Sequence, residues 1–225
     1  MRIQWRTEWP FWLLLEAQFL LAAVTWPMAP EQIPTHWGLD GRADGYGNRL
    51  QGLLLLPLVA LGLYLALLIA PQIGDRRDAF PPFAGSYTVL RFAVLAVMTA
   101  MYGMIHLAIR GYEVEMNRVV PLSIGALFMV IGNQMGQLRP ADPAAPSTAA
   151  PAPSSHSSRA AWTRTNRHAG RLMGGAGMVM IVAGLFSSSW LMVGAVAGTV
   201  TGAVWLTVSS YGARQKDADQ DGAGL

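Results

Sequence analysis

A loop rich in glycine, histidine and aspartate is the segment of this sequence with the most potential for chemistry. His36, Asp40 and Asp44 could gather around a cation, since imidazole and carboxylate groups are common metal ligands. An EF-hand is excluded, because Arg42 falls at the third position of such a loop and Gln51 at the twelfth, where a bidentate glutamate belongs. The loop is therefore a compact structural turn, a partner-binding surface or a metal site. We expect no resident metal and no cofactor.

Three polar residues interrupt otherwise apolar stretches: Glu16, Arg91 and Asn133. Charged groups are costly at membrane depth, so such residues are functional candidates. All three lie at a similar depth from the same end of their stretches. We therefore expect an ion pair between Glu16 and Arg91 with Asn133 bonded nearby, serving either a structural contact or a proton or signalling role. His106 lies near the other end of its stretch, where we expect an interfacial hydrogen bond rather than a metal ligand.

The elements that must position these residues are membrane-spanning helices. Of the 225 residues, 52% are hydrophobic and only 13% are charged, about half the charged share of a soluble domain. Six stretches are close to the 20 apolar residues that a spanning helix needs: 9–28, 50–71, 88–109, 119–138, 168–187 and 190–211. The composition thus predicts an all-α, polytopic integral membrane six-helix bundle. The absence of cysteine excludes disulfides, thiolate nucleophiles and cysteine–zinc sites.

The stretches divide the chain into four parts. Residues 1–136 form a four-span region that contains the glycine-rich loop, 29–49. Residues 137–167 form a connection with an alanine-, proline- and serine-rich tether, whose composition predicts disorder. Residues 168–211 form a two-span helical hairpin, and residues 212–225 form a tail that we also expect to be disordered.

The distribution of basic residues predicts the orientation. With the N-terminus inside, 12 basic residues lie in inside segments and four lie outside. The 12 are Arg2, Arg6, Arg76, Arg77, Arg91, Arg139, Arg159, Arg164, Arg167, Arg171, Arg214 and Lys216, and the four are Arg42, Arg49, Arg110 and Arg118. Cytoplasmic loops carry the excess of Lys and Arg, so we expect both termini in the cytoplasm and the loop 29–49 outside.

The outside loop carries a pattern made of Ile33, Pro34, His36, Trp37, Gly41, Asp44, Tyr46, Gly47 and Arg49. This pattern resembles the N-terminal domain of unknown function found in SdpI-type immunity proteins. An Asn-x-x-Gly follows at Asn133 and Gly136, and a second motif matches at Trp162, Thr165, Arg167 and Gly170. Two departures occur in the cytoplasmic loop: Asn166 replaces a family histidine, and the tether occupies the place of a family element.

The resemblance implies a six-span protein of the bacterial inner membrane that protects its cell from a secreted peptide toxin. It also implies a signalling role, in which the occupied protein holds a small cytoplasmic repressor. The residues do not favour an enzyme, because no nucleotide-binding or hydrolytic motif occurs, and we expect no direct contact with nucleic acid. The alternative function is a small proton-coupled transporter that uses Glu16.

Small residues at four-residue spacing predict close helix packing. They are Gly170 and Gly174 in the fifth stretch, and Gly194, Gly198 and Gly202 in the sixth. The glycines of the sixth stretch serve either contacts within the chain or a homodimer.

Overall fold

The computed structural model of the chain describes residues 5–72, 84–137 and 156–222. Its helices are α1 (Trp5–Thr25), α2 (Arg49–Ile69), α3 (Ala84–Ile109), α4 (Met116–Gln137), α5 (His156–Leu185) and α6 (Ser189–Gly222). Two strands, β1 (Ile33–Trp37) and β2 (Ala43–Gly47), lie between α1 and α2, and short 3-10 turns follow α1 (Trp26–Met28) and α2 (Ala70–Gln72).

All six helices are long and apolar enough to cross a membrane, which confirms the predicted all-α multi-pass architecture. Two helices are longer than predicted. α5 begins at His156 rather than near His168, and α6 continues to Gly222 although we expected an irregular tail after Gly212. Most of the predicted tether, Pro140–Ser158, lies within residues 138–155, which are outside the described residues.

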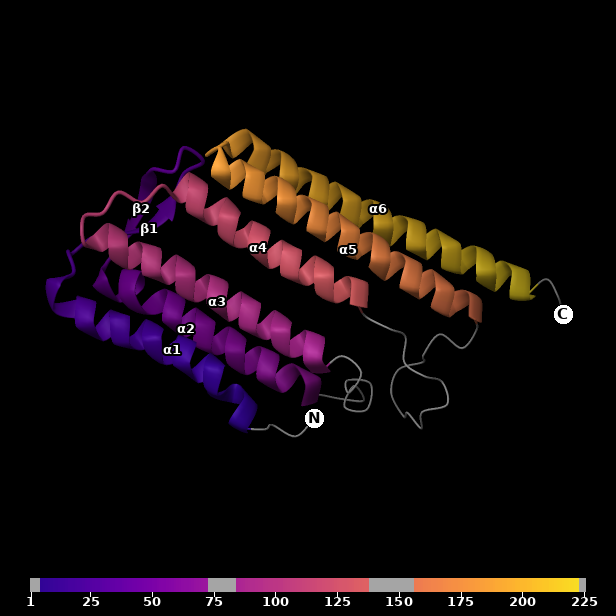
Figure 1. The fold of residues 1–225 in the computed structure, drawn as a ribbon, viewed down its shortest axis with the longest axis horizontal. Coiled ribbons are helices and arrows are strands. Elements are labelled where there is room, and N and C mark those ends of the chain that lie inside the picture. Colours follow the sequence, from indigo (N-terminus) through magenta and orange to yellow (C-terminus); the bar gives the residue numbers. More distant parts are fainter. Residues whose placement is uncertain (1–4, 73–83, 138–155, 223–225) are drawn as a thin grey trace.

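The helices form two groups of three (Figure 1). α1, α2 and α3 contact one another, α4 packs against α3 and α5, and α6 packs against α5. The strands lie at one end of the bundle, which we call the hairpin end, while α1 begins and α6 ends at the opposite end, which we call the terminal end (Figure 1). The hairpin therefore lies across the membrane from the start of α1.

The glycine-rich loop folds as an antiparallel β-hairpin, with irregular pairing around His36. Ile33 is fully buried and lies over the first turn of α2, where a Cβ on Gly52 would approach the Ile33 Cβ to 2.5 Å. Asn48 caps α2: its side chain accepts a hydrogen bond from the Gln51 backbone, and the Gln51 side chain accepts one from the Asn48 backbone. The hairpin is thus fixed directly to the helix that follows it.

Glycines repeated every seven residues bring α4 and α5 into backbone contact. A Cβ on Gly132 would lie 2.6 Å from the carbonyl oxygen of Gly170, and one on Gly125 would lie 2.8 Å from that of Gly177. One step of seven residues along α4 therefore matches one step of seven in the reverse direction along α5, as in an antiparallel pair. Such close approach is how helices associate in lipid, where apolar surface alone gives no preference for a protein partner.

Candidate functional site

One buried stripe along α1 carries both apolar and polar side chains. Its members follow alternate steps of three and four residues, the spacing of one helix face: Glu8, Phe11, Leu15, Gln18, Ala22 and Thr25. Three of the six are polar, and all three are at most 4% exposed. A polar group in such a position requires a partner, because an unpaired one is costly to bury.

The partners come from α3, and together they form a polar seam of three contacts. Glu8 pairs with Arg91 at 2.7 Å, the Gln18 amide donates to the Thr99 hydroxyl at 2.9 Å, and Thr25 shares a 2.8 Å hydrogen bond with His106. The paired residues are separated by a nearly constant 83, 81 and 81 positions, so the two helices run parallel in matching register. The seam follows the α1–α3 interface from the terminal end to the hairpin end.

Each contact in the seam also leaves one buried atom without a hydrogen-bond partner. Among the described residues four such side-chain atoms occur, and three of them are Arg91 Nε, Gln18 Oε1 and His106 Nε2. Buried polar atoms are nearly always paired, so unpaired ones mark strain or an absent ligand or water. Their concentration at this interface distinguishes it from the glycine-packed contact between α4 and α5.

The contact at the terminal end is the most elaborate of the three. The Arg91 guanidinium donates through Nη1 and Nη2 to the two carboxylate oxygens of Glu8, and the Tyr64 hydroxyl donates to Glu8 Oε2 at 2.9 Å. The rings of Phe11 and Tyr64 lie 4.5 and 5.3 Å from the guanidinium carbon. A bidentate ion pair with aromatic neighbours and a third hydrogen bond is the arrangement that makes a buried charge pair tolerable. We call these four residues the Glu8–Arg91 centre.

The expected pairing of Glu16 with Arg91 is wrong. Glu16 is exposed on the surface of α1, and Asn133 is exposed on α4. Glu8 takes the place of Glu16 because it falls on the buried stripe, whereas Glu16 lies one position beyond Leu15 and outside it. The three residues that depth alone grouped together do not form a cluster.

Glu8, Gln18 and Thr25 were therefore missed as site residues, and so were Tyr64 and Thr99. The regular spacing from Glu8 to Thr25 was the available signal in the sequence, but it was hidden by the apolar residues on the other faces of α1. The hydrogen bond expected of His106 is present, and its partner is Thr25.

The hairpin places His36 and Asp44 side by side on its open face. Their side chains are 73% and 54% exposed, and the His36 Nδ1 atom lies 2.5 Å from the Asp44 carboxylate. The Asp40 side chain accepts a hydrogen bond from the Arg42 backbone within the turn. No group of three potential metal ligands occurs in the described part of the chain.

The other predicted loop residues divide into buried and exposed positions. Gly47 is buried against Gln51 and Thr35, as the close approach of β2 to α2 requires. Pro34 and Trp37 are half-buried and Tyr46 is 58% exposed. Arg49 donates to the Pro30 carbonyl at 3.4 Å, closing the base of the loop.

The turn of the hairpin reaches the second helix group. Gly41 has a φ of +78°, and a Cβ there would lie 3.0 Å from the side chain of Asn117 in α4. The Ser189 hydroxyl, at the start of α6, donates to the Leu39 carbonyl. The hairpin thus belongs to the first helix group but also contacts two helices of the second.

At the terminal end the structure brings together part of the predicted relay. A Cβ on Gly170 would lie 3.1 Å from the backbone nitrogen of Gly136, so these two residues are neighbours. Arg167 is exposed and Thr165 is half-buried on α5. Trp162 lies on α5, but its side chain is outside the part that the structure describes.

The chain matches two known families. Residues 13–61, which include most of α1, the hairpin and the first half of α2, match a domain of unknown function, DUF1648. Residues 152–210, which include α5 and most of α6, match the SdpI/YfhL protein family. No curated protein and no solved structure matches the chain. The two matches, one in each half of the chain, show that the chain is similar to SdpI-type proteins in both regions.

Proposed function

We propose that this membrane protein protects a bacterium against a secreted peptide toxin and signals across the inner membrane that the toxin is bound. It acts without catalysis, the hairpin forms the toxin-binding surface, and the terminal end recruits a small repressor. The single observation that carries the proposal is the position of the hairpin turn, which contacts α4 and α6 while the open face of the hairpin remains exposed.

The hairpin surface has the chemistry of a peptide-binding face. Tyr46 and Leu39 are 58% and 59% exposed, and the His36–Asp44 pair lies between β1 and β2. Aromatic side chains beside a small number of polar groups are typical of interface anchors. The distribution of basic residues supports an orientation with this face outside and both termini in the cytoplasm.

The two matched regions meet at this face, which supports a relay. The hairpin lies in the first region, and Ser189 begins the last helix of the second. A change in the hairpin would be transmitted to α6, whose far end lies at the terminal end beside α5 (Figure 1). The proposed repressor would dock there, near Gly136, Arg167 and Gly170.

Glu16, the acid that the transporter alternative requires, is exposed on α1 and does not belong to the polar seam.

On α6, Gly202 packs against Leu172 within the chain, whereas a Cβ on Gly194 or Gly198 would have nothing within 4 Å in the described residues. Packing of a second copy on that part of α6 is the corresponding proposal for a homodimer.

The test of the function is expression in a toxin-sensitive bacterial strain. Cells that produce the protein should survive peptide toxins secreted by strains that carry SdpI-type genes, and cells with the empty vector should not. Equal killing of both cultures by every toxin tested would contradict the proposal.

Replacing Asp44 with Asn should reduce protection about tenfold, the effect of losing one good interface contact. Folding should change by about 1 kcal/mol or less, because the His36–Asp44 pair is exposed. The measurements are the inhibitory toxin concentration and the free energy of unfolding in detergent. Glu115→Gln is the matched control, since Glu115 forms a similarly exposed pair with Arg118 outside the hairpin. Equal loss of protection in both variants would contradict a specific role for Asp44 in binding the toxin.

Replacing Ser189 with Ala should leave toxin binding intact but reduce its transmission to α6 about fivefold, because the hydroxyl that holds the Leu39 carbonyl is removed. The chain has no cysteine, so a single Val208→Cys variant can carry an environment-sensitive dye on α6. The measurement is the fluorescence change on toxin addition. Thr199→Ala is the control, because that hydroxyl donates to Ala195 within the same helix. An unchanged response in Ser189→Ala would show that the signal does not pass through this contact.

A further inference from the structure

At the hairpin end, the polar seam finishes on a histidine whose ring has a hydrogen-bond partner on one side only. His106 is 3% exposed, and its Nδ1 atom shares a 2.8 Å hydrogen bond with the Thr25 hydroxyl. Its Nε2 atom is buried and has no hydrogen-bond partner in the described structure. A neutral imidazole has one N–H donor, whereas a protonated ring has two. Protonation would therefore leave a buried, charged N–H without an acceptor, which is costly.

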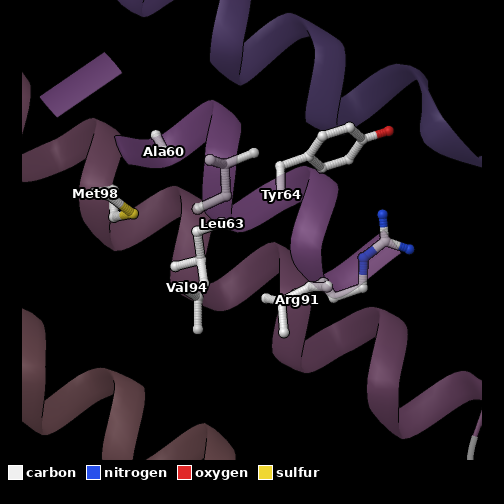
Figure 2. Close-up of a pocket in the computed structure, with 8 residues that line it drawn as sticks. Ala60, Leu63, Tyr64, Arg91, Val94 and Met98 are labelled. Carbon is white, nitrogen blue, oxygen red and sulfur yellow. The ribbon is translucent and has the colours of Figure 1, made fainter. Parts of the chain in front are cut away.

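The ionisable groups at the two ends of the seam differ in their counter-charge. At the terminal end, Arg91 forms a bidentate pair with Glu8, and Figure 2 shows its guanidinium beside the Tyr64 ring. At the hairpin end, no carboxylate of the described residues forms an ion pair with His106. The nearest charged residue along α3 is Arg110, one turn further on, and it has the same sign as a protonated ring. The charge of a protonated His106 would thus remain uncompensated.

The other elements at this end bring no counter-charge to the ring. α1, α2 and β1 contribute apolar side chains to the buried cluster beside it: Ala22, Leu53 and Ile33. The Tyr102 hydroxyl donates to the Leu53 carbonyl, which α2 leaves free because residue 57 is a proline without an N–H. The acidic residues of the connections before β1 and before α4 are exposed, and they are Glu31, Glu113 and Glu115, the last of which pairs with Arg118.

The same histidine lies against the residues that hold the hairpin in place. Its ring packs edge to face with Tyr102, with 4.4 Å between the ring centroids. Tyr102 is fully buried in one cluster with Ile33, the first residue of β1, and with Ala29. Thr25, the partner of Nδ1, is the last residue of α1 and precedes the segment that leads to β1. Water that reached a protonated ring would therefore separate α1 from α3 where both helices hold Ile33.

Protonated His106 is thus compatible with an open end of the bundle and not with a closed one. We infer that His106 makes the attachment of the hairpin depend on pH: the neutral ring stays buried beside Thr25 and keeps Ile33 in the bundle, and protonation opens this contact and releases the hairpin. In the open state the exposed ring takes up a proton as the pH falls below about 6.5, whereas the closed state excludes that proton, so acidification favours opening. The inference rests on the buried ring and holds whether or not the hairpin binds a toxin.

The test is hydrogen–deuterium exchange of the full-length protein in nanodiscs at about pH 7.5 and about pH 5.5, both above the range in which exposed carboxylates titrate. After correction for the intrinsic effect of pH on exchange, the amides of residues 29–37 should lose about tenfold in protection at the lower pH, since opening is linked to one proton. Amides near Gly125 and Gly177, in the α4–α5 contact, should change less than about twofold. A change of less than about twofold at residues 29–37 would overturn the inference, and this outcome needs no variant to fold.

Two variants identify the histidine that responds. His106→Asn keeps an amide that can bond Thr25 but cannot take up a proton, so its protection at the two pH values should differ less than about twofold, even where the variant is less stable at both. His36→Gln removes the exposed histidine of the hairpin itself and should keep the loss of about tenfold. A pH response that survives in His106→Asn, or that disappears in His36→Gln, would overturn the assignment to His106.

Discussion

Replacing Arg91 with Ala is expected to lower the free energy of unfolding by about 3–5 kcal/mol. The substitution removes both hydrogen bonds from Arg91 to Glu8, a residue that is only 4% exposed in the intact protein, and leaves the Tyr64 hydroxyl as the remaining partner of the carboxylate. It also removes the guanidinium from between Phe11 and Tyr64. The measurement is unfolding of the purified protein by SDS in mixed micelles, followed by circular dichroism.

Two controls separate the buried pair from charge in general. Arg118→Ala breaks an exposed pair in which Arg118 and Glu115 are 51% and 57% exposed, and should cost about 1 kcal/mol or less. The double variant Glu8→Met with Arg91→Met should recover most of the lost stability, because no charge is then left unpaired. If Arg91→Ala unfolds like the wild type, the Glu8–Arg91 centre does not stabilise the bundle.

The double variant also distinguishes structure from function. If it folds and still protects cells from the toxin, the ion pair serves only to hold α1, α2 and α3 together. If it folds but no longer protects, the charges themselves belong to the signalling mechanism. The double variant and the wild type are compared at equal amounts of folded protein in the membrane, so a loss of protection cannot come from a loss of folded protein.

Replacing Gly170 with Val is expected to cost about 1–3 kcal/mol by forcing α4 and α5 apart. A Cβ at this position would lie 2.7 Å from the carbonyl oxygen of Gly132, and neither backbone can move without shifting its whole helix. The measurement is again the free energy of unfolding in mixed micelles, together with the level of protein in the membrane.

Gly174→Val is the matched control, one turn further along the same helix. A Cβ on Gly174 has nothing within 4 Å in the described residues, so this substitution should change the stability by less than about 0.5 kcal/mol. Equal destabilisation by the two variants would mean that the intrinsic preference of valine in this helix, and not the contact with α4, sets the cost.

For these glycines, the sequence predicted close helix packing but not the residue at which it occurs. Their four-residue spacing correctly predicted that α5 packs closely against a neighbour at Gly170. It did not distinguish Gly170 from Gly174, since both fit the same spacing and only the position of α4 decides at which of them a Cβ would meet the neighbouring backbone. The same holds for α6: among the described residues, a Cβ on Gly202 would contact Leu172, whereas a Cβ on Gly194 or Gly198 would contact nothing within 4 Å.

In the candidate site, too, the sequence pointed to one part, the glycine-rich loop, and missed another, the polar seam. The glycine-rich loop was singled out by its residue types as a segment that could fold tightly, but its two strands and the contact between His36 and Asp44 were not predicted. The polar seam was not found, since the three contacts join residues 81 or more positions apart. Depth in the membrane was a sound reason to pair Arg91 with a glutamate, but it could not select Glu8 over Glu16.

By itself the sequence determined the membrane class, the six spans and the family resemblance, because apolar length and local motifs are properties of contiguous residues. Only the tertiary structure decided which polar side chains meet inside the bundle. The helices are rotated so that one stripe of each faces inward, and this rotation depends on every neighbouring helix at once. The loop that first suggested chemistry is therefore now one end of a larger arrangement, whose hairpin contacts both helix groups and whose polar seam continues to the opposite side of the membrane.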